Sequence, residues 1–436
     1  MAVGRFRRDR GVSTPVPAAR DDGAVSSPRL SRRGLLGGGV AAAGVAGAFV
    51  AGRASAEDAE SAVAASYAFR GEHQAGIVTP AQDRLHFAAF DLLTTDRDEV
   101  VALLQDWTEA AERMTQGDGA GEVGPVEGDP LLPPDDTGEA IGLPPARLTI
   151  TFGFGPTFFD KLDLVDRRPQ ALRRLPHFPA DVLVEEISDG DLCVQACADD
   201  PQVAVHAVRN LARIAFGRAA VRWSQLGFGR TSSTSTTQDT ARNLFGFKDG
   251  TANLKAEQPD LVDTHVWVGA DDDPAAGWLA GGSYLVARRI TMTIELWDRQ
   301  PLADQEQFVG RTKGVGAPLG GEKEFDEPDF DAVTGLAPTI PVDAHVRLVH
   351  PSFHGGAQML RRGYNFVDGS TPLGALNAGL FFIAYVRDPD THFIPIQNAM
   401  AKSDAMMEYL KVNGSALFAV PPGAGPGEHV GQALFA

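Results

Sequence analysis

An aspartate between two glycines is the first residue in this chain whose setting could support chemistry. Asp249 lies in the segment Gly246-Phe247-Lys248-Asp249-Gly250, among apolar and aromatic neighbours. Asp-Gly is a common turn dipeptide, so the local sequence by itself favours a structural turn. A role as an acid or base would require other functional groups that the rest of the chain brings to this turn.

Three histidines crowd into residues 345–354 and could bind a metal. His345, His350 and His354 together could form a mononuclear site, but their spacing mixes the two faces of a strand. A single axial ligand is simpler, because His345 in a short apolar strand could bind haem iron through one ring nitrogen. A structural role is the alternative for each histidine taken alone.

Two adjacent arginines, Arg361 and Arg362, follow an apolar pair. Such arginines often lie at a solvated edge, where their stems cover hydrophobic surface. An arginine set into a pocket can instead stabilise negative charge that develops on a substrate oxygen. The local sequence does not choose between these roles, but Asp249, His345 and Arg361 are together the groups that a haem peroxidase uses.

The elements that must position these residues alternate between strands and helices. In the first half, apolar periodicity predicts strands over 86–93, 148–155 and 191–198, and helices from residue 100 to 111 and over 201–216. Residues 116–145 are rich in Gly, Pro, Asp and Glu and predict a surface loop or insertion. This order suits a ferredoxin-like α+β unit.

The second half predicts the same plan again. Strands are expected over 282–296, 344–349 and 379–386, and helices over 301–311 and 403–412. The boundary between the units is expected near 240–280, where Gly, Asp and Pro cluster. We therefore expect an N-terminal domain of residues 57–245 and a C-terminal domain of residues 246–436.

The two cysteines, Cys193 and Cys197, lie in a predicted buried strand. Four residues of strand separate them by about 13 Å, which is too far for a disulfide bond. Both are expected to be small core residues. The chain contains no C-x-x-C-H motif, which excludes covalent attachment of c-type haem.

The N-terminus and the charge distribution indicate export. Residues 1–56 hold nine Arg and three Asp and so carry a charge of +6. Because the net charge of the whole chain is −18, the remaining residues carry −24. So acidic a mature protein is a poor partner for nucleic acid or anionic membranes. Arg32-Arg33, a weakly apolar run over 37–51 and Ala54-Ser55-Ala56 are typical of a cleaved twin-arginine signal peptide. A retained N-terminal anchor is the alternative.

Six stretches together resemble the dye-decolorising peroxidase family, in the branch that includes secreted actinobacterial enzymes and the deferrochelatase/peroxidase of iron-uptake operons. They span nearly all of the mature chain and follow the order of the family. These stretches are residues 69–77, 190–192, 246–250, 309–313 with 316–319, 345–347 with 360–364, and 379–385 through 414–418.

The resemblance implies a fold, a cofactor and a set of site residues. It implies two ferredoxin-like domains that enclose a noncovalent b-type haem. Asp249 would be the distal acid/base, Arg361 the distal arginine and His345 the proximal iron ligand. The remaining residues expected at the haem site are Phe247, Gly250, Leu380 and Phe382.

The function implied is that of an exported haem peroxidase, located outside the cell or in its envelope. It would reduce hydrogen peroxide through a ferryl intermediate and oxidise dyes, phenols, metal species or other one-electron donors. The alternative is a deferrochelatase-type, haem-handling component of iron acquisition, with permease components as partners. A haem-free member of the fold is a third alternative, since fold does not determine function. A homo-oligomer is also allowed.

Two finer expectations concern electron transfer and the iron ligand. Bulky donors cannot enter a pocket sized for peroxide, so electrons would reach the haem at its edge or through aromatic side chains. A proximal histidine usually donates its second N–H to a carboxylate or carbonyl, and Asp404 is the candidate for His345. The candidate relay residues are Trp267, Trp297, Tyr364 and Tyr385.

Overall fold

The computed structural model describes residues 65–436. The predicted signal peptide, residues 1–56, lies outside the described residues. Within residues 65–436, no helix is both long enough and apolar enough to cross a membrane.

Apart from the short helix α3, which follows the second strand, the first half of the described chain has the order strand, helix, strand, strand, helix, strand. Neighbouring strands pair antiparallel in the order β2-β3-β1-β4. The predicted ferredoxin-like unit is therefore confirmed. Its elements are β1 (Arg84–Leu92), α2 (Arg97–Thr115), β2 (Thr149–Phe154), α3 (Pro156–Lys161), β3 (Leu192–Ala198), α4 (Pro201–Ile214) and β4 (Ala219–Arg230).

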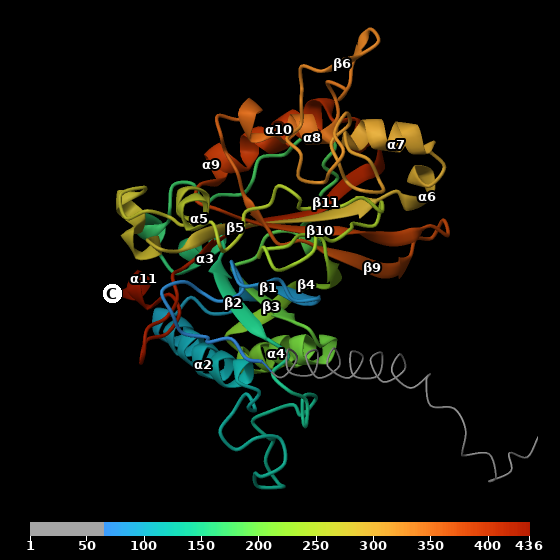
Figure 1. Cartoon of the computed structure of the whole chain (residues 1–436). Coiled ribbons are helices and arrows are strands. Elements are labelled where there is room, and N and C mark those ends of the chain that lie inside the picture. The colour runs from blue at the N-terminus through green and yellow to red at the C-terminus, as the bar shows by residue number, and fades with distance from the viewer. Residues whose placement is uncertain (1–64) are drawn as a thin grey trace, which may run out of the picture. The chain divides into compact units, whose positions relative to one another are not determined.

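Helices α2 and α4 begin at capping aspartates and cover one face of this sheet. The Asp96 side chain accepts a hydrogen bond from the backbone of Asp98, and Asp200 caps α4 in the same way. The apolar stripe expected between residues 100 and 111 is the buried face of α2, where Trp107 stacks on Phe152 of β2. Figure 1 shows both helices on the side of the sheet away from the second half.

The second half repeats the plan, as predicted. Its sheet has the order β9-β10-β5-β11, and every neighbouring pair is antiparallel. The elements from here to the C-terminus are α5 (Pro259–His265), β5 (Ser283–Met292), α6 (Ile294–Trp297), α7 (Leu302–Val309), β6 (Val333–Thr334), β7 (Ala337–Pro338), α8 (His345–Leu348), β8 (Leu360–Arg361), β9 (Tyr364–Ser370), β10 (Leu376–Val386), α9 (Pro389–His392), α10 (Ile394–Ser403), β11 (Leu410–Val420) and α11 (Gln432–Phe435).

The two sheets join edge to edge on both sides. Strand β11 pairs with β2 through Ala419 and Phe154, and β4 pairs with β9. The closed ring of eight strands encloses an apolar core that includes Phe87, Phe381 and Phe418. The inner faces of both sheets are therefore occupied, and only the outer face of the second sheet is left for a site.

Two of the predicted elements are wrong, and the strand predicted over 282–296 is too long, because β5 ends at Met292 and the helix α6 begins at Ile294. Residues 344–349 form the short helix α8 and not a strand, because an apolar run of this length is ambiguous by periodicity. Residues 403–412 are not one helix. Asp404 ends α10, its side chain caps a new 3-10 turn at Met406, and β11 begins at Leu410. The strand β4 was not anticipated.

The predicted loop 116–145 and the predicted state of the cysteines are confirmed. No helix or strand begins between Gln116 and Pro145. The loop is held by Asp136, which accepts hydrogen bonds from the backbone of Ala120 and Gly138. Cys193 and Cys197 are both free and buried in β3.

Candidate active site

A cavity of about 220 Å³ lies between the outer face of the second sheet and helices α7, α8 and α10. The alternation of side chains along the strands builds its floor. On β10, Leu380 and Phe382 face the cavity, whereas Phe381 and Ile383 point into the core between the sheets. On β5, Ile290 faces the cavity in the same way.

Asp249 is presented to the cavity by the glycine-flanked turn. Gly246 and Gly250 have φ values of +82° and +88°, which side chains rarely adopt, so both glycines are needed for the turn. A Cβ at Gly250 would also approach the Ser232 backbone to 2.9 Å. Gly250 itself does not line the cavity, whereas Phe247 and Asp249 do. The turn and the possible acid/base role are therefore compatible.

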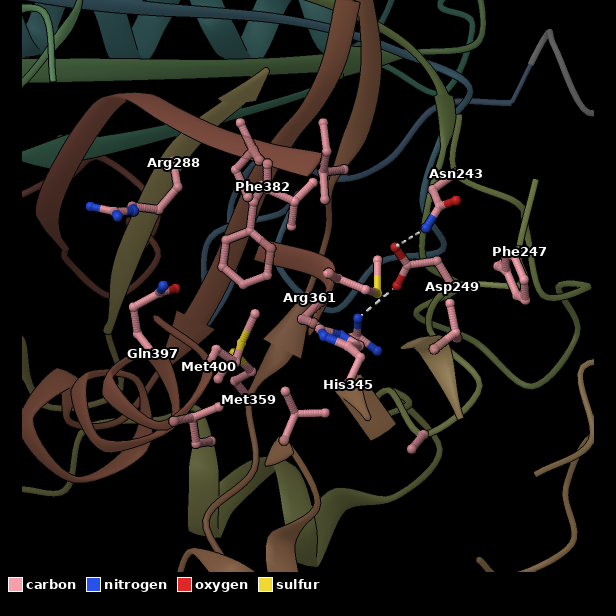
Figure 2. A pocket seen from close by; sticks show the side chains of 18 of the residues that line it. Asn243, Phe247, Asp249, Arg288, His345, Met359, Arg361, Phe382, Gln397 and Met400 are labelled. Atoms are coloured by element: carbon pink, nitrogen blue, oxygen red, sulfur yellow. Dashed lines mark hydrogen bonds and ion pairs between the residues drawn. The ribbon is translucent and has the colours of Figure 1, made fainter. Parts of the chain in front are cut away.

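Arg361 reaches Asp249 from β8, across the cavity wall (Figure 2). Its Nη1 donates to Asp249 Oδ1 at 2.7 Å, and Asn243 Nδ2 donates to the other oxygen at 3.4 Å. Asn253 fixes the backbone of Arg361, because its Oδ1 accepts from Arg361 N at 2.7 Å and its Nδ2 donates to Arg361 O at 2.8 Å. The carboxylate and the guanidinium are thus held as one unit.

Arg362 points the opposite way and has a different role. It is completely buried, and its guanidinium donates to the carbonyl of Thr79 at 2.5 Å and to the side chain of Gln82. It does not line the cavity. Strand alternation therefore separates the two arginines, with Arg361 at the cavity and Arg362 in the interior.

His345 enters the cavity from the first residue of α8. Its Nδ1 lies 2.6 Å from Oδ2 of Asp404, whose side chain is fully buried at the end of α10. This is the partner expected from the sequence. Burial alone would lower the pKa of His345, but the charge of Asp404 and its hydrogen bond outweigh burial and raise it above the ordinary value. With Nδ1 engaged, Nε2 is the ring nitrogen left for a ligand bond.

The three-histidine metal site does not form. His350 Nδ1 bonds the hydroxyl of Ser352, and His354 Nε2 bonds the carbonyl of Leu348. Among residues 65–436, no cluster of three or more His, Cys, Asp or Glu side chains could hold a metal ion. Of the three histidines, only His345 lines the cavity.

The cavity residues fit a haem. Nε2 of His345 is free to bind iron as an axial ligand. The carboxylate of Asp404 at Nδ1 is the usual hydrogen-bond partner of a histidine that binds a metal. The walls are mostly apolar, as a porphyrin requires. Arg288 also borders the cavity: its guanidinium donates to Asp181 and Ser415, and its Nε has no partner among the described residues. Such a donor suits the acidic substituents of a haem.

The four aromatic side chains proposed as electron relays lie outside the cavity lining. Trp297 is buried and stacks on Phe245 with ring centroids 4.2 Å apart. Trp267 stacks on His73 at 3.8 Å. Tyr364 and Tyr385 are buried within the core between the sheets. A relay through any of them stays a prediction.

Several residues of the site were missed by sequence reasoning. Asn243 and Asn253 position the pair of Asp249 and Arg361, yet a lone asparagine carries no signal of such a role. Asn253 follows the segment Gly246–Gly250 closely, so a motif extended by three residues would have included it. Arg288 lies in a strand that alternates regularly, and nothing local separates it from a surface arginine.

Two family models match the chain. The model described as Dyp-type peroxidase, N-terminal, matches residues 74–229, and that described as Dyp-type peroxidase, C-terminal, matches residues 240–425. The cavity-lining residues, from Asn243 to Leu410, all fall within the second range. The boundary expected at residue 245 stays a prediction.

Individual relatives are similar over most of their length. A dye-decolorizing peroxidase of Thermobifida fusca is 40% identical over 374 residues, which is 83% of each chain. A deferrochelatase of Escherichia coli K12 is 37% identical over 372 residues, covering 84% of this chain and 86% of the relative. The structure of ferric DtpA from Streptomyces lividans matches with a TM-score of 0.79 and 40% identity, over 86% of this chain and 99% of that one.

Proposed function

The chain belongs to the Dyp-type peroxidase family and is a haem-dependent peroxidase, and we propose that Asp249, Arg361 and His345 carry its reaction. The observation that supports this assignment is their convergence on one cavity: the ion pair of Asp249 and Arg361 faces the same space as the free edge of His345 (Figure 2).

The proposed cofactor is a noncovalent b-type haem with His345 as its iron ligand. Asp404 would hold the ring of His345 in one orientation and increase its basicity as a ligand. Leu380 and Phe382 would pack as apolar walls. When bound, the haem supplies an iron that accepts electrons from donors and passes them to peroxide.

Asp249 and Arg361 would perform the proton and charge chemistry on hydrogen peroxide. Cleavage of the O–O bond needs a proton to move from one peroxide oxygen to the other, and the Asp249 carboxylate is placed to carry it. Arg361 would stabilise the charge on the departing oxygen. Because aspartic acid is a stronger acid than histidine, a base of this type should act down to acidic pH.

An absorption spectrum before and after one equivalent of peroxide tests this proposal. The parent should show a Soret band that shifts on addition of peroxide, and Asp249→Ala should bind haem but shift on the order of 100-fold more slowly. His345→Ala should lose or strongly alter the Soret band, whereas His350→Ala, five residues away and outside the cavity lining, should keep it. An unaltered spectrum in His345→Ala would rule out the ligand assignment.

Export by the twin-arginine route is the proposed localisation, on the basis of Arg32-Arg33 and the weakly apolar run that follows. The enzyme would then act outside the cell or in its envelope. Replacing both arginines by Lys should leave the enzyme, with its N-terminal segment uncut, inside the cell. Export of this variant at the parental level would refute the proposal.

A second candidate function is release of iron from haem, because the Escherichia coli relative is named deferrochelatase. In that case the donors would matter less than iron-uptake permease components as partners. Incubating the haem-loaded protein without peroxide, in the presence of an iron chelator, distinguishes the two functions. Free porphyrin together with chelated iron would favour this candidate, and intact haem would exclude it.

A further inference from the structure

Glu324 is a buried carboxylate that bonds both sides of the turn that presents Asp249, although it does not line the cavity itself. Its Oε2 accepts a hydrogen bond from Lys248 Nζ, and its Oε1 accepts one from Thr251 Oγ1 at 3.2 Å. Lys248 directly precedes Asp249, and Thr251 follows it closely. A single side chain, 76 residues from Lys248 in the sequence, therefore spans the turn.

The backbone around Glu324 is itself fixed. The carbonyl of Glu324 accepts a hydrogen bond from Arg311 Nη1 at 2.9 Å. Asp326 Oδ2 accepts from the backbone N of Glu322 and of Lys323, each at 2.8 Å, and so closes the turn that contains Glu324. The carboxylate of Glu324 is therefore presented to the Asp249 turn from a restrained segment.

The carboxylate of Glu324 is ionised at neutral pH. Burial alone would raise its pKa, but the hydrogen bond and the charge of Lys248, with further hydrogen bonds, outweigh burial and lower the pKa below its ordinary value. Only 10% of the Glu324 side chain is exposed, so the ion pair with Lys248 is poorly screened by water. The ammonium group next to Asp249 in the chain is thereby engaged by Glu324, and Asp249 bonds Arg361 instead.

The two sides of the turn depend on Glu324 to different degrees. On the N-terminal side, the backbone N of Asp249 also donates to the carbonyl of Ala241 at 2.9 Å. On the C-terminal side, Gly250 lies between Asp249 and Thr251 and has a φ of +88°. Because a glycine has no side chain to restrict its backbone, the contact of Thr251 with Glu324 limits the freedom of the chain after Asp249.

We propose that Glu324 is a positioning residue for Asp249. It clamps the turn through Lys248 and Thr251 and so keeps the Asp249 carboxylate against Arg361. This inference rests on the proposed function, because that function assigns the proton transfer to Asp249. A misplacement of about 1 Å can cost about 100-fold in rate, so a side chain that touches neither peroxide nor haem can still control the reaction.

The experiment compares variants of the haem-loaded protein. Glu324→Ala should slow the Soret shift on addition of peroxide by about 10- to 100-fold. Glu324→Gln retains the volume and one acceptor oxygen, so it should recover part of this rate. Glu327→Gln is the matched control, because it removes the same charge from a nearby side chain that is 84% exposed, and it should react like the parent.

The Asp249→Ala background separates positioning from a general structural role. If Glu324 acts through Asp249, then Glu324→Ala should slow Asp249→Ala no further, because both changes remove the same effect. A general structural role would instead slow the reaction by a similar factor in both backgrounds. Cyanide binding is a second readout. Cyanide enters as HCN and also gives up a proton, so its association should slow in the same variants.

The outcomes distinguish this inference from the proposed function. A parental rate of peroxide reaction or of cyanide association in Glu324→Ala overturns the inference alone when Asp249→Ala by itself is slow, and so does equal slowing in both backgrounds. If Glu324→Ala does not fold, Thr251→Val removes one arm of the clamp at nearly constant size and is compared in the same two backgrounds. Asp249→Ala that reacts with peroxide at the parental rate overturns the proposed function as well.

Discussion

Arg361 and Arg362 are neighbours in the chain whose replacement should have opposite consequences. Arg361 borders the cavity, and 26% of its side chain is exposed, whereas Arg362 is wholly buried between the sheets. The perturbation is a single change to Ala at each position. The two variants have the same composition, so any difference between them comes from the direction in which each side chain points.

Arg361→Ala should lose rate and keep stability. Removing one group that stabilises developing charge typically costs on the order of 100-fold, or about 3 kcal/mol of transition-state stabilisation. The ion pair with Asp249 is partly exposed, so its loss should change the free energy of unfolding by no more than about 1 kcal/mol. Stopped-flow absorbance after mixing with peroxide measures the rate.

Arg362→Ala should lose stability. Truncating a large buried side chain leaves a cavity and typically costs about 3 kcal/mol or more. Gln82 Oε1 would also lose its hydrogen-bond donor, whereas the carbonyl of Thr79 keeps a second donor in Thr234. At about 2.1 cal/mol/K for each of roughly 370 residues, 3 kcal/mol corresponds to a fall in Tm of about 4 °C.

Thermal melts at equal haem occupancy, together with the peroxide reaction rate, decide the outcome. Equal occupancy matters because a ligand bound to the native state raises Tm. Arg362→Met is a control that retains most of the stem and should recover part of the lost stability. If Arg362→Ala reacts slowly while melting like the parent, or Arg361→Ala melts early with a normal rate, the roles derived from strand alternation are wrong.

Two further predictions concern other histidines and their partners. Burial lowers the pKa of His86 from 6.5 to about 4. As the pH falls, this histidine is therefore protonated in the unfolded chain before it is protonated in the folded protein. The folded protein accordingly loses stability as the pH falls from 6.5 towards 4. Urea unfolding measures this effect. On going from about pH 7.5 to pH 5, the free energy of unfolding of His86→Leu should rise by about 2 kcal/mol relative to that of the parent. An equal rise in the exposed control His177→Leu would contradict this prediction. Asp404→Asn should weaken haem binding by about 10- to 100-fold in a Soret titration, because His345 loses its carboxylate partner, while the exposed neighbour Asp343→Asn should bind haem like the parent. Parental affinity in Asp404→Asn would show that the hydrogen bond does not support the ligand.

Local sequence patterns predicted much of the secondary structure. The stripe of apolar residues that includes Trp107 predicts α2, and alternation predicts β3 and β10, because each element shows its buried face at its own period. The strand predicted over residues 344–349 was wrong because an apolar run of that length fits both the helical and the strand period. The helix predicted over 403–412 was wrong because Asp404 caps a new turn inside this segment. The local sequence does not show whether such an aspartate caps a turn or lies on the surface.

The sequence by itself determined which side chains could do chemistry and that Asp249 would be held in a tight turn. A turn depends on residues adjacent in the chain, and the flanking glycines supply its backbone geometry. The tertiary structure decided which of these groups meet. Arg361 is 112 residues from Asp249, and Asp404 is 59 residues from His345. Such pairs form through strand pairing and helix packing over the whole domain, and these depend on long-range contacts that no local pattern specifies.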